Sequence, residues 1–137
     1  MTEAPAYGQG DATFRAVGGE AGVNQLVDSF YDIMGSDSRY KLIWSWHPNK
    51  EVSRDKLARF LCGWMGGPRR YQERYGSISI PDVHKHLPID HSAKDLWLSC
   101  MQDALVAQEF PETLVTYLLE QLAIPAEMIR RRCVQNL

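Results

Sequence analysis

Three of the four histidines in this chain, His84, His86 and His91, are concentrated between positions 84 and 91. The prolines and glycines around them predict an irregular stretch that joins two long helices. Imidazoles in such a stretch are most simply solvated loop residues. Two kinds of chemistry are the alternatives: a zinc site that adds Asp82 or Asp90 to the three imidazoles, or a single imidazole bound to haem iron.

The residue types favour haem over zinc. A closed zinc site needs four ligands, usually with cysteine among them, and Cys62, Cys100 and Cys133 are all distant from the histidines in sequence. A haem needs one neutral imidazole, an apolar slot and a few hydrogen-bond donors on the far side. Tyr31 and Trp97 stand on apolar helical stripes and are candidate donors, although ordinary core packing is the simpler interpretation of each taken alone.

Two amphipathic stretches predict the first two long helices. In residues 22–34 and again in residues 52–65, the apolar side chains follow the 3.6-residue period of a helix with one buried face. A Gly18-Gly19 turn precedes the first stretch, and Gly66-Gly67-Pro68 terminates the second. The apolar positions are Val23, Leu26, Val27, Phe30, Tyr31 and Met34 in the first stretch and Leu57, Phe60, Leu61 and Trp64 in the second.

Two more helices are predicted in the second half of the chain. Asp90 or Ser92 is the expected N-cap of the third helix, and Pro111 stands at the start of the fourth. Pro125 is expected to kink or break the fourth helix. Residues 69–90 are predicted to be irregular. No sheet fits between these segments, so the predicted fold class is all-α.

The composition is that of an ordinary globular protein. Lys plus Arg is 15 and Asp plus Glu is 17, which gives a net charge of −2 and no electrostatic case for binding nucleic acid or an anionic membrane. No apolar run is long enough for a membrane span, and the first residues lack the pattern of a signal peptide. The odd number of cysteines favours a reduced, cytoplasmic setting. We expect a flexible N-terminal arm, residues 1–12, before a single domain, residues 13–137.

Four motifs, taken in order, resemble those of the truncated haemoglobins of group II, which are short globins with a two-on-two helical sandwich. The first is the Gly18-Gly19 turn followed by Phe30-Tyr31-Asp32, and the second is His47-Pro48. The third is Phe60-Leu61-x-Gly63-Trp64-Met65-Gly66-Gly67-Pro68, with Tyr71 and Glu73 after it. The fourth is Asp95-Leu96-Trp97-Leu98-x-Cys100-Met101. Together they cover roughly residues 15–133.

The resemblance implies a globin domain around haem b, with a proximal histidine on the iron. His84 matches that position without a gap, because it lies sixteen residues after Pro68 and thirteen residues before Trp97. Leu87 and Ile89 then occupy the family's apolar positions beside the haem. His86 is the competing ligand, but it would need an insertion before it and a matching deletion after it.

The resemblance also implies a distal side and a pocket wall. Tyr31, His47 and Trp97 would line the distal side, where phenol, imidazole and indole are all capable donors. Tyr31 is also an alternative ligand of ferric iron. The remaining implied positions are Ser53 and Leu57 on the distal helix and Phe60 and Met101 in the wall.

One position departs from the family pattern. Val83 stands where the family commonly has an arginine that pairs with a haem propionate. The candidates for that pairing here are Lys85, Arg54 and Lys56.

The implied function is that of a b-type haem protein that binds O2 and other diatomic ligands such as NO and CO. Peroxide reduction or NO dioxygenation would be side activities that need a reductase which the sequence does not name. A cofactor-free helical interaction module is the alternative, distinguished by the absence of a haem absorption band. The sequence leaves monomer and homodimer both open.

Overall fold

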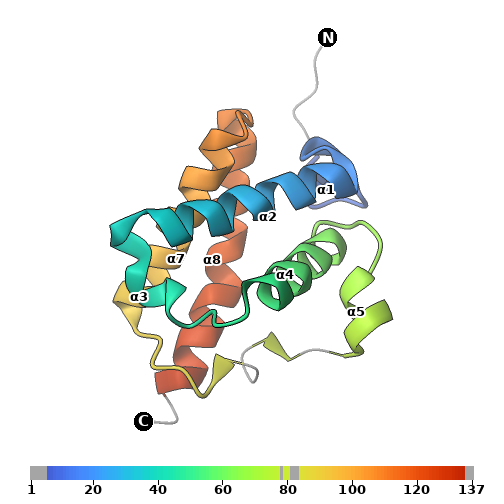
Figure 1. Ribbon diagram of the computed structural model, residues 1–137. Helices are drawn as coiled ribbons and strands as arrows, with labels where there is room; N and C mark the ends of the chain where they lie inside the picture. Colours follow the sequence, from blue (N-terminus) through green and yellow to red (C-terminus); the bar gives the residue numbers. More distant parts are fainter. Residues whose placement is uncertain (1–5, 78, 81–83, 135–137) are drawn as a thin grey trace.

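The computed structural model describes residues 6–77, 79–80 and 84–134, and every regular element in this part of the chain is helical (Figure 1). The all-α prediction is confirmed. No helix in this part is long and apolar enough to cross a membrane. The elements are α1 (Ala12–Ala16), α2 (Gly19–Ser36), the 3₁₀ turn η1 (Ser38–Tyr40), α3 (Lys41–Trp44), α4 (Lys50–Trp64), α5 (Arg70–Tyr75), α7 (His91–Ala107) and α8 (Glu112–Val134).

The four predicted long helices are α2, α4, α7 and α8. The apolar side chains that α2 buries are those of the predicted stripe. Gly18 precedes α2 at a φ of +100°, a left-handed conformation that glycine adopts without steric cost. Asp90 is the N-cap of α7, because its side chain accepts a hydrogen bond of 2.9 Å from the Ala93 N–H. Pro111 immediately precedes α8, as expected.

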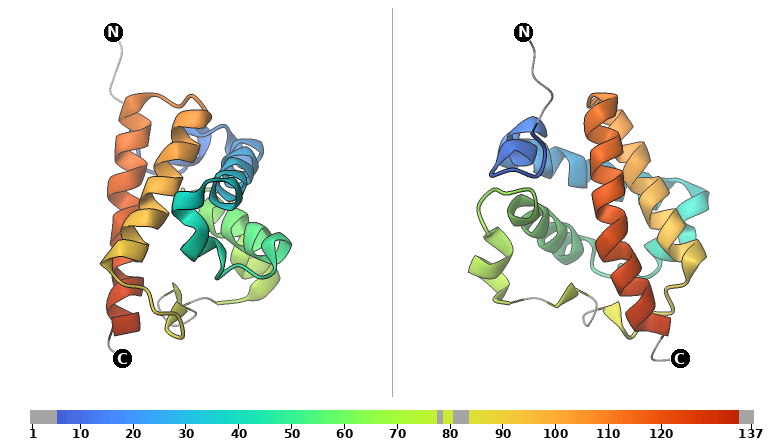
Figure 2. Two further views of the ribbon diagram at one scale, coloured as in Figure 1. Left: turned by 60° about the vertical axis from the view of Figure 1, so that its left-hand side comes forward. Right: turned by 180° about the vertical axis from the view of Figure 1, so that it is seen from behind.

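The long helices form two antiparallel pairs, one stacked across the other. α2 packs on both α4 and α7, and α7 packs on α8. Figure 1 shows α2 crossing α7 and α8, and the left view of Figure 2 shows α7 and α8 side by side with α2 and α4 on one face of them. The buried apolar residues of α2, α4 and α7, and those of α8 as far as Leu122, belong to one apolar cluster.

Two predictions about irregular or broken structure are wrong. Residues 69–90 contain the helix α5, and Ile80 and His84 are also helical. Pro125 does not break α8, which is continuous from Glu112 to Val134. A proline inside a helix removes one backbone hydrogen bond. The buried side chains on both sides of Pro125, Leu122 and Cys133, keep the helix packed across that loss.

A hydrogen-bonded network anchors the segment between α2 and α4 to α7. The Tyr40 hydroxyl donates to Asp103 Oδ2 at 2.6 Å and lies 3.1 Å from the Ser99 hydroxyl. Arg39 bridges Asp37 and the same Asp103 carboxylate, at 2.8 and 3.0 Å. The Tyr40 side chain itself is fully buried. These contacts hold η1 and α3, and therefore the loop that carries His47, against α7.

The N-terminal segment contacts α8. The Tyr7 ring lies 5.2 Å from the Tyr117 ring, measured between centroids, and its hydroxyl is 3.3 Å from the Thr113 hydroxyl. Residues 1–5 of the predicted arm are outside the described residues.

Candidate functional site

A cavity of about 500 Å³ lies between the two helix pairs, within the size range of small-molecule and cofactor sites. Leu57 and Phe60 of α4 are only partly buried, because they line the cavity as well as packing against the core. The lining includes nine of the residues expected at the site from the sequence: Tyr31, His47, Ser53, Leu57, Phe60, His84, Leu87, Ile89 and Trp97.

Two expected site residues are not on the cavity wall. Met101 is fully buried in the core shared by the helices. Lys85 is exposed, and its side chain is not part of the lining. Val83 and Asp82 lie outside the described residues.

His84 lines the cavity with one ring nitrogen held by the backbone. Its Nδ1 is 2.7 Å from the Ile80 carbonyl oxygen, so the neutral ring donates its Nδ1–H there and keeps the Nε2 lone pair free. Burial lowers the pKa of His84 and so favours the neutral ring. Metal-bound histidines usually donate their second ring nitrogen to a carbonyl or carboxylate in this way. The competing residue His86 also lines the cavity but is exposed.

The zinc alternative has no ligand cluster. Among the described residues, no three or more His, Cys, Asp or Glu side chains come together in a group that could hold a metal ion. The cavity instead offers imidazoles without a metal cluster, among them His84 and His47, each fixed by a backbone carbonyl, and this donor set fits a haem.

Tyr31 of α2 provides a buried side chain on the cavity wall. The side chain is 4% exposed and its hydroxyl lies 3.5 Å from the Ser53 carbonyl oxygen, which is a long hydrogen bond. Burial raises the pKa of Tyr31 well above its usual 10.0, so the phenol stays protonated and remains a donor. Its ring makes edge contacts with Phe30 and His47, at centroid distances of 5.1 and 5.4 Å.

Trp97 provides a second donor from α7. Its indole lies edge-on to Phe30 at 5.2 Å between ring centroids, and this packing fixes the plane of the ring. The side chain lines the cavity, and no hydrogen bond to its indole N–H is present among the described residues. Its N–H is therefore available to a ligand.

His47 differs from the sequence-based expectation of a donor. Its Nδ1 is 2.8 Å from the Ile43 carbonyl oxygen, and from this contact we assign the proton of the neutral ring to Nδ1. Burial, and the proximity of His84, lower the pKa of His47, so the neutral form is favoured. In that form Nε2 is an acceptor, and the cavity donors are Tyr31 and Trp97.

We predict that His47 makes the haem-free protein less stable in mild acid. The unfolded chain binds a proton on this ring near pH 6.5, whereas the folded protein binds it only at lower pH. Stability is therefore complete above about pH 6.5 and falls below it. The free energy of unfolding, measured in urea at about pH 7.5 and about pH 5.5, should fall less between these two pH values in His47→Gln than in the parent. The loss does not vanish, since His84 acts in the same direction.

The exposed His91 supplies the control for this experiment. His91→Gln should keep the pH dependence of the parent. An unchanged loss of stability in His47→Gln would contradict the assignment of His47 as a buried neutral ring.

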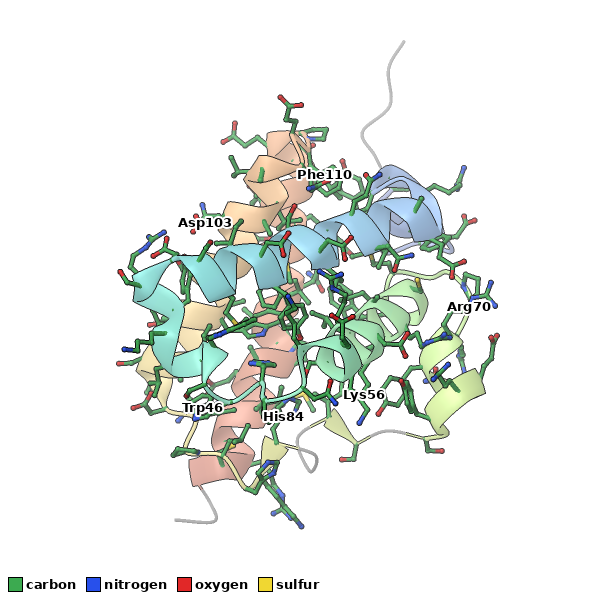
Figure 3. The ribbon with its side chains drawn as sticks, in the orientation of Figure 1. Trp46, Lys56, Arg70, His84, Asp103 and Phe110 are labelled. Atoms are coloured by element: carbon green, nitrogen blue, oxygen red, sulfur yellow. The ribbon has the colours of Figure 1, made fainter. Side chains whose placement is uncertain are left out.

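Lys56 is the cation best placed for a haem propionate. It lines the cavity and is exposed, with its Nζ 5.4 Å from the Tyr75 ring centroid. Lys94 also lines the cavity, but its Nζ is paired with Glu127 at 3.1 Å. Arg54, another candidate from the sequence, is already paired with two carboxylates of α2. Trp46, His84 and Lys56 all line the cavity, and Figure 3 shows that these labelled side chains come from three different segments.

Several lining residues were missed by the sequence analysis. Ala126 and Ile129 of α8 continue the helical period of Leu122, and this signal would have found them if the helix had been extended beyond Pro125. Trp46 lies in the segment before α4 and shows no periodicity that could place it.

Comparisons with known proteins show the family of this chain. The bacterial-like globin family matches residues 12–130. The chain is 35% identical over 95 residues to a group 2 truncated hemoglobin of Bacillus subtilis, a match that covers 69% of this chain and 70% of that protein. Two solved structures are also similar. A cold-adapted truncated hemoglobin of Pseudoalteromonas haloplanktis has a TM-score of 0.81 at 29% identity, covering 85% of this chain and 95% of that one. A truncated oxygen-avid haemoglobin of Bacillus subtilis has a TM-score of 0.74 at 30% identity, covering 85% and 97%.

Proposed function

Because this chain belongs to the bacterial-like globins, and within them to the group II truncated haemoglobins, we propose that His84 is the axial ligand of its haem and that Tyr31 and Trp97 retain bound O2. Membership of the family makes the protein a two-on-two globin that carries haem and binds O2. It also removes the alternative of a cofactor-free interaction module. The identity of the ligand-holding residues is the proposal.

The observation that carries the proposal is the hydrogen bond between His84 Nδ1 and the Ile80 carbonyl oxygen at 2.7 Å. It orients the ring and leaves Nε2 as the coordinating atom on the cavity side. Haem supplies an iron that binds O2 and gives it partial negative charge. Lys56 at the cavity opening is the residue to hold a propionate, and Leu57, Phe60 and Ile89 keep water away from the macrocycle.

The distal donors decide how long O2 is held. A hydrogen bond to a charged group contributes roughly 1.5–3 kcal/mol. Two such bonds slow the release of O2 by on the order of 10²- to 10⁴-fold, because about 1.4 kcal/mol is a factor of ten. This supports holding O2, or reacting with it, over delivering it. The similar Bacillus subtilis structure is described as oxygen-avid, which agrees with this proposal.

The test replaces Trp97 by phenylalanine, which keeps an aromatic ring and removes the N–H. We expect O2 to dissociate about tenfold faster or more. Stopped-flow displacement of O2 by CO measures this rate. CO carries less negative charge than bound O2, so CO dissociation should change much less.

Trp64→Phe is the matched control, because Trp64 is a partly buried tryptophan of α4 that does not line the cavity. Its O2 dissociation rate should equal that of the parent. Equal acceleration in both variants would mean that Trp97 acts through packing alone.

A further inference from the structure

Cys133, near the end of α8, is hydrogen-bonded to the segment that carries the axial histidine. Its side chain is 1% exposed, and its Sγ lies 3.2 Å from the carbonyl oxygen of His84. A thiol is a weak donor, and a carbonyl oxygen can only accept, so the S–H donates here. This contact joins two segments that are 49 residues apart in sequence.

The contact differs in kind from the other hydrogen bonds of His84. The carbonyl of His84 also accepts from the Leu87 N–H at 3.0 Å, and the imidazole donates to the Ile80 carbonyl at 2.7 Å. Both of these partners are within four residues of His84. Among the hydrogen bonds of the described residues, the one from Cys133 is the bond that ties His84 to another helix.

The helix that carries Cys133, α8, also forms part of the cavity wall. Ala126 and Ile129 of α8 line the cavity, and Cys133 follows Ile129 by four residues on the same helix. The position of the His84 turn relative to this wall is therefore set through the Cys133 contact. Local hydrogen bonds alone would leave the turn free to shift as a unit against α8.

We infer that Cys133 is a positioning residue for the axial ligand, whose S–H···O=C bond to His84 sets where the imidazole sits relative to the cavity wall. The inference rests on the proposed role of His84. Loss of the thiol leaves no unsatisfied carbonyl, because Leu87 still donates to it. The expected effect is therefore on the bond between the imidazole and the iron more than on global stability.

The test compares Cys133→Ala with Cys133→Ser, which keeps a donor. Cys62→Ala is the control, since Cys62 is also buried at 2% exposed, lies on α4 and does not line the cavity. Resonance Raman spectra of the ferrous, ligand-free holoproteins report the iron–imidazole stretch. Transfer of haem to an excess of a high-affinity apoglobin reports how firmly haem is held.

In Cys133→Ala we expect the iron–imidazole band to shift and broaden. We also expect haem loss to become about tenfold faster, because removing a group that orients a metal ligand weakens metal binding by at least about this factor. Cys133→Ser should restore the parent band and rate, and Cys62→Ala should leave both unchanged. Three results would each overturn the inference. The first is a Cys133→Ala variant with the band and the haem-loss rate of the parent, and the second is a Cys133→Ser variant that behaves like Cys133→Ala. The third is the same pair of changes in Cys62→Ala.

Failure of the proposed function gives a different result. If His84 is not the ligand, an iron–imidazole band persists in haem-loaded His84→Ala. If that band requires His84 but is insensitive to Cys133, the proposed function stands and this inference alone is wrong.

Discussion

His84→Ala is expected to lose its tight hold on haem. The substitution removes the imidazole proposed as the axial ligand, which lines the cavity with its Nδ1 fixed by the Ile80 carbonyl. Loss of a group behind a metal ligand costs about 10- to 100-fold in affinity, so loss of the ligand itself should cost more than about 100-fold. Titration of the haem-free protein with hemin, followed by the intense blue haem band, measures this affinity.

His86→Ala is the matched control, because His86 is a second imidazole on the same cavity. It should bind hemin like the parent. In His84→Gly, the substitution leaves space for a free ring, so added imidazole should restore the absorption spectrum of a haem with an imidazole ligand. Loss of hemin binding in His86→Ala together with its retention in His84→Ala would transfer the ligand role to His86.

The second large effect is expected from Tyr31→Phe. Removing the hydroxyl should speed O2 dissociation by roughly 10- to 100-fold, because a hydrogen bond to the partly charged ligand contributes about 1.5–3 kcal/mol. The long contact of this hydroxyl with the Ser53 carbonyl, at 3.5 Å, contributes little to folding, so the variant should fold normally. Stopped-flow measurement of O2 release gives the rate.

Tyr71→Phe is the control for Tyr31, since Tyr71 is another buried tyrosine on the cavity wall. Its O2 release should match that of the parent. The high pKa of Tyr31 adds a further expectation: its effect should not change with pH across the neutral range, because the buried phenol remains protonated. An O2 dissociation rate unchanged by Tyr31→Phe would remove this residue from the distal role.

These expectations assign different tasks to similar side chains. Both His84 and His47 are neutral rings with Nδ1 directed at a carbonyl four residues earlier. They differ in the element that holds them. His84 is tied to α8 through Cys133, whereas His47 belongs to the loop that the Tyr40 network fixes against α7. Position in the fold, more than residue type, separates the axial candidate from the distal one.

The order and type of the long helices could be predicted from the sequence by itself. Helical periodicity is a local property, since one buried face requires apolar residues at a spacing of about 3.6. The Asp90 cap and the Gly18 turn are local for the same reason. The preference for His84 over His86 also follows from spacing along the chain.

Only the tertiary structure decided which members of each stripe face the cavity. Trp97 and Met101 are four residues apart on the same face of α7, yet Trp97 lines the cavity and Met101 is buried in the core. Packing of α2 on α7 decides which residues of the stripe are covered, and the period of α7 alone does not contain that information. The continuation of α8 past Pro125 also depends on tertiary packing, because contacts with other helices offset the backbone hydrogen bond that proline removes.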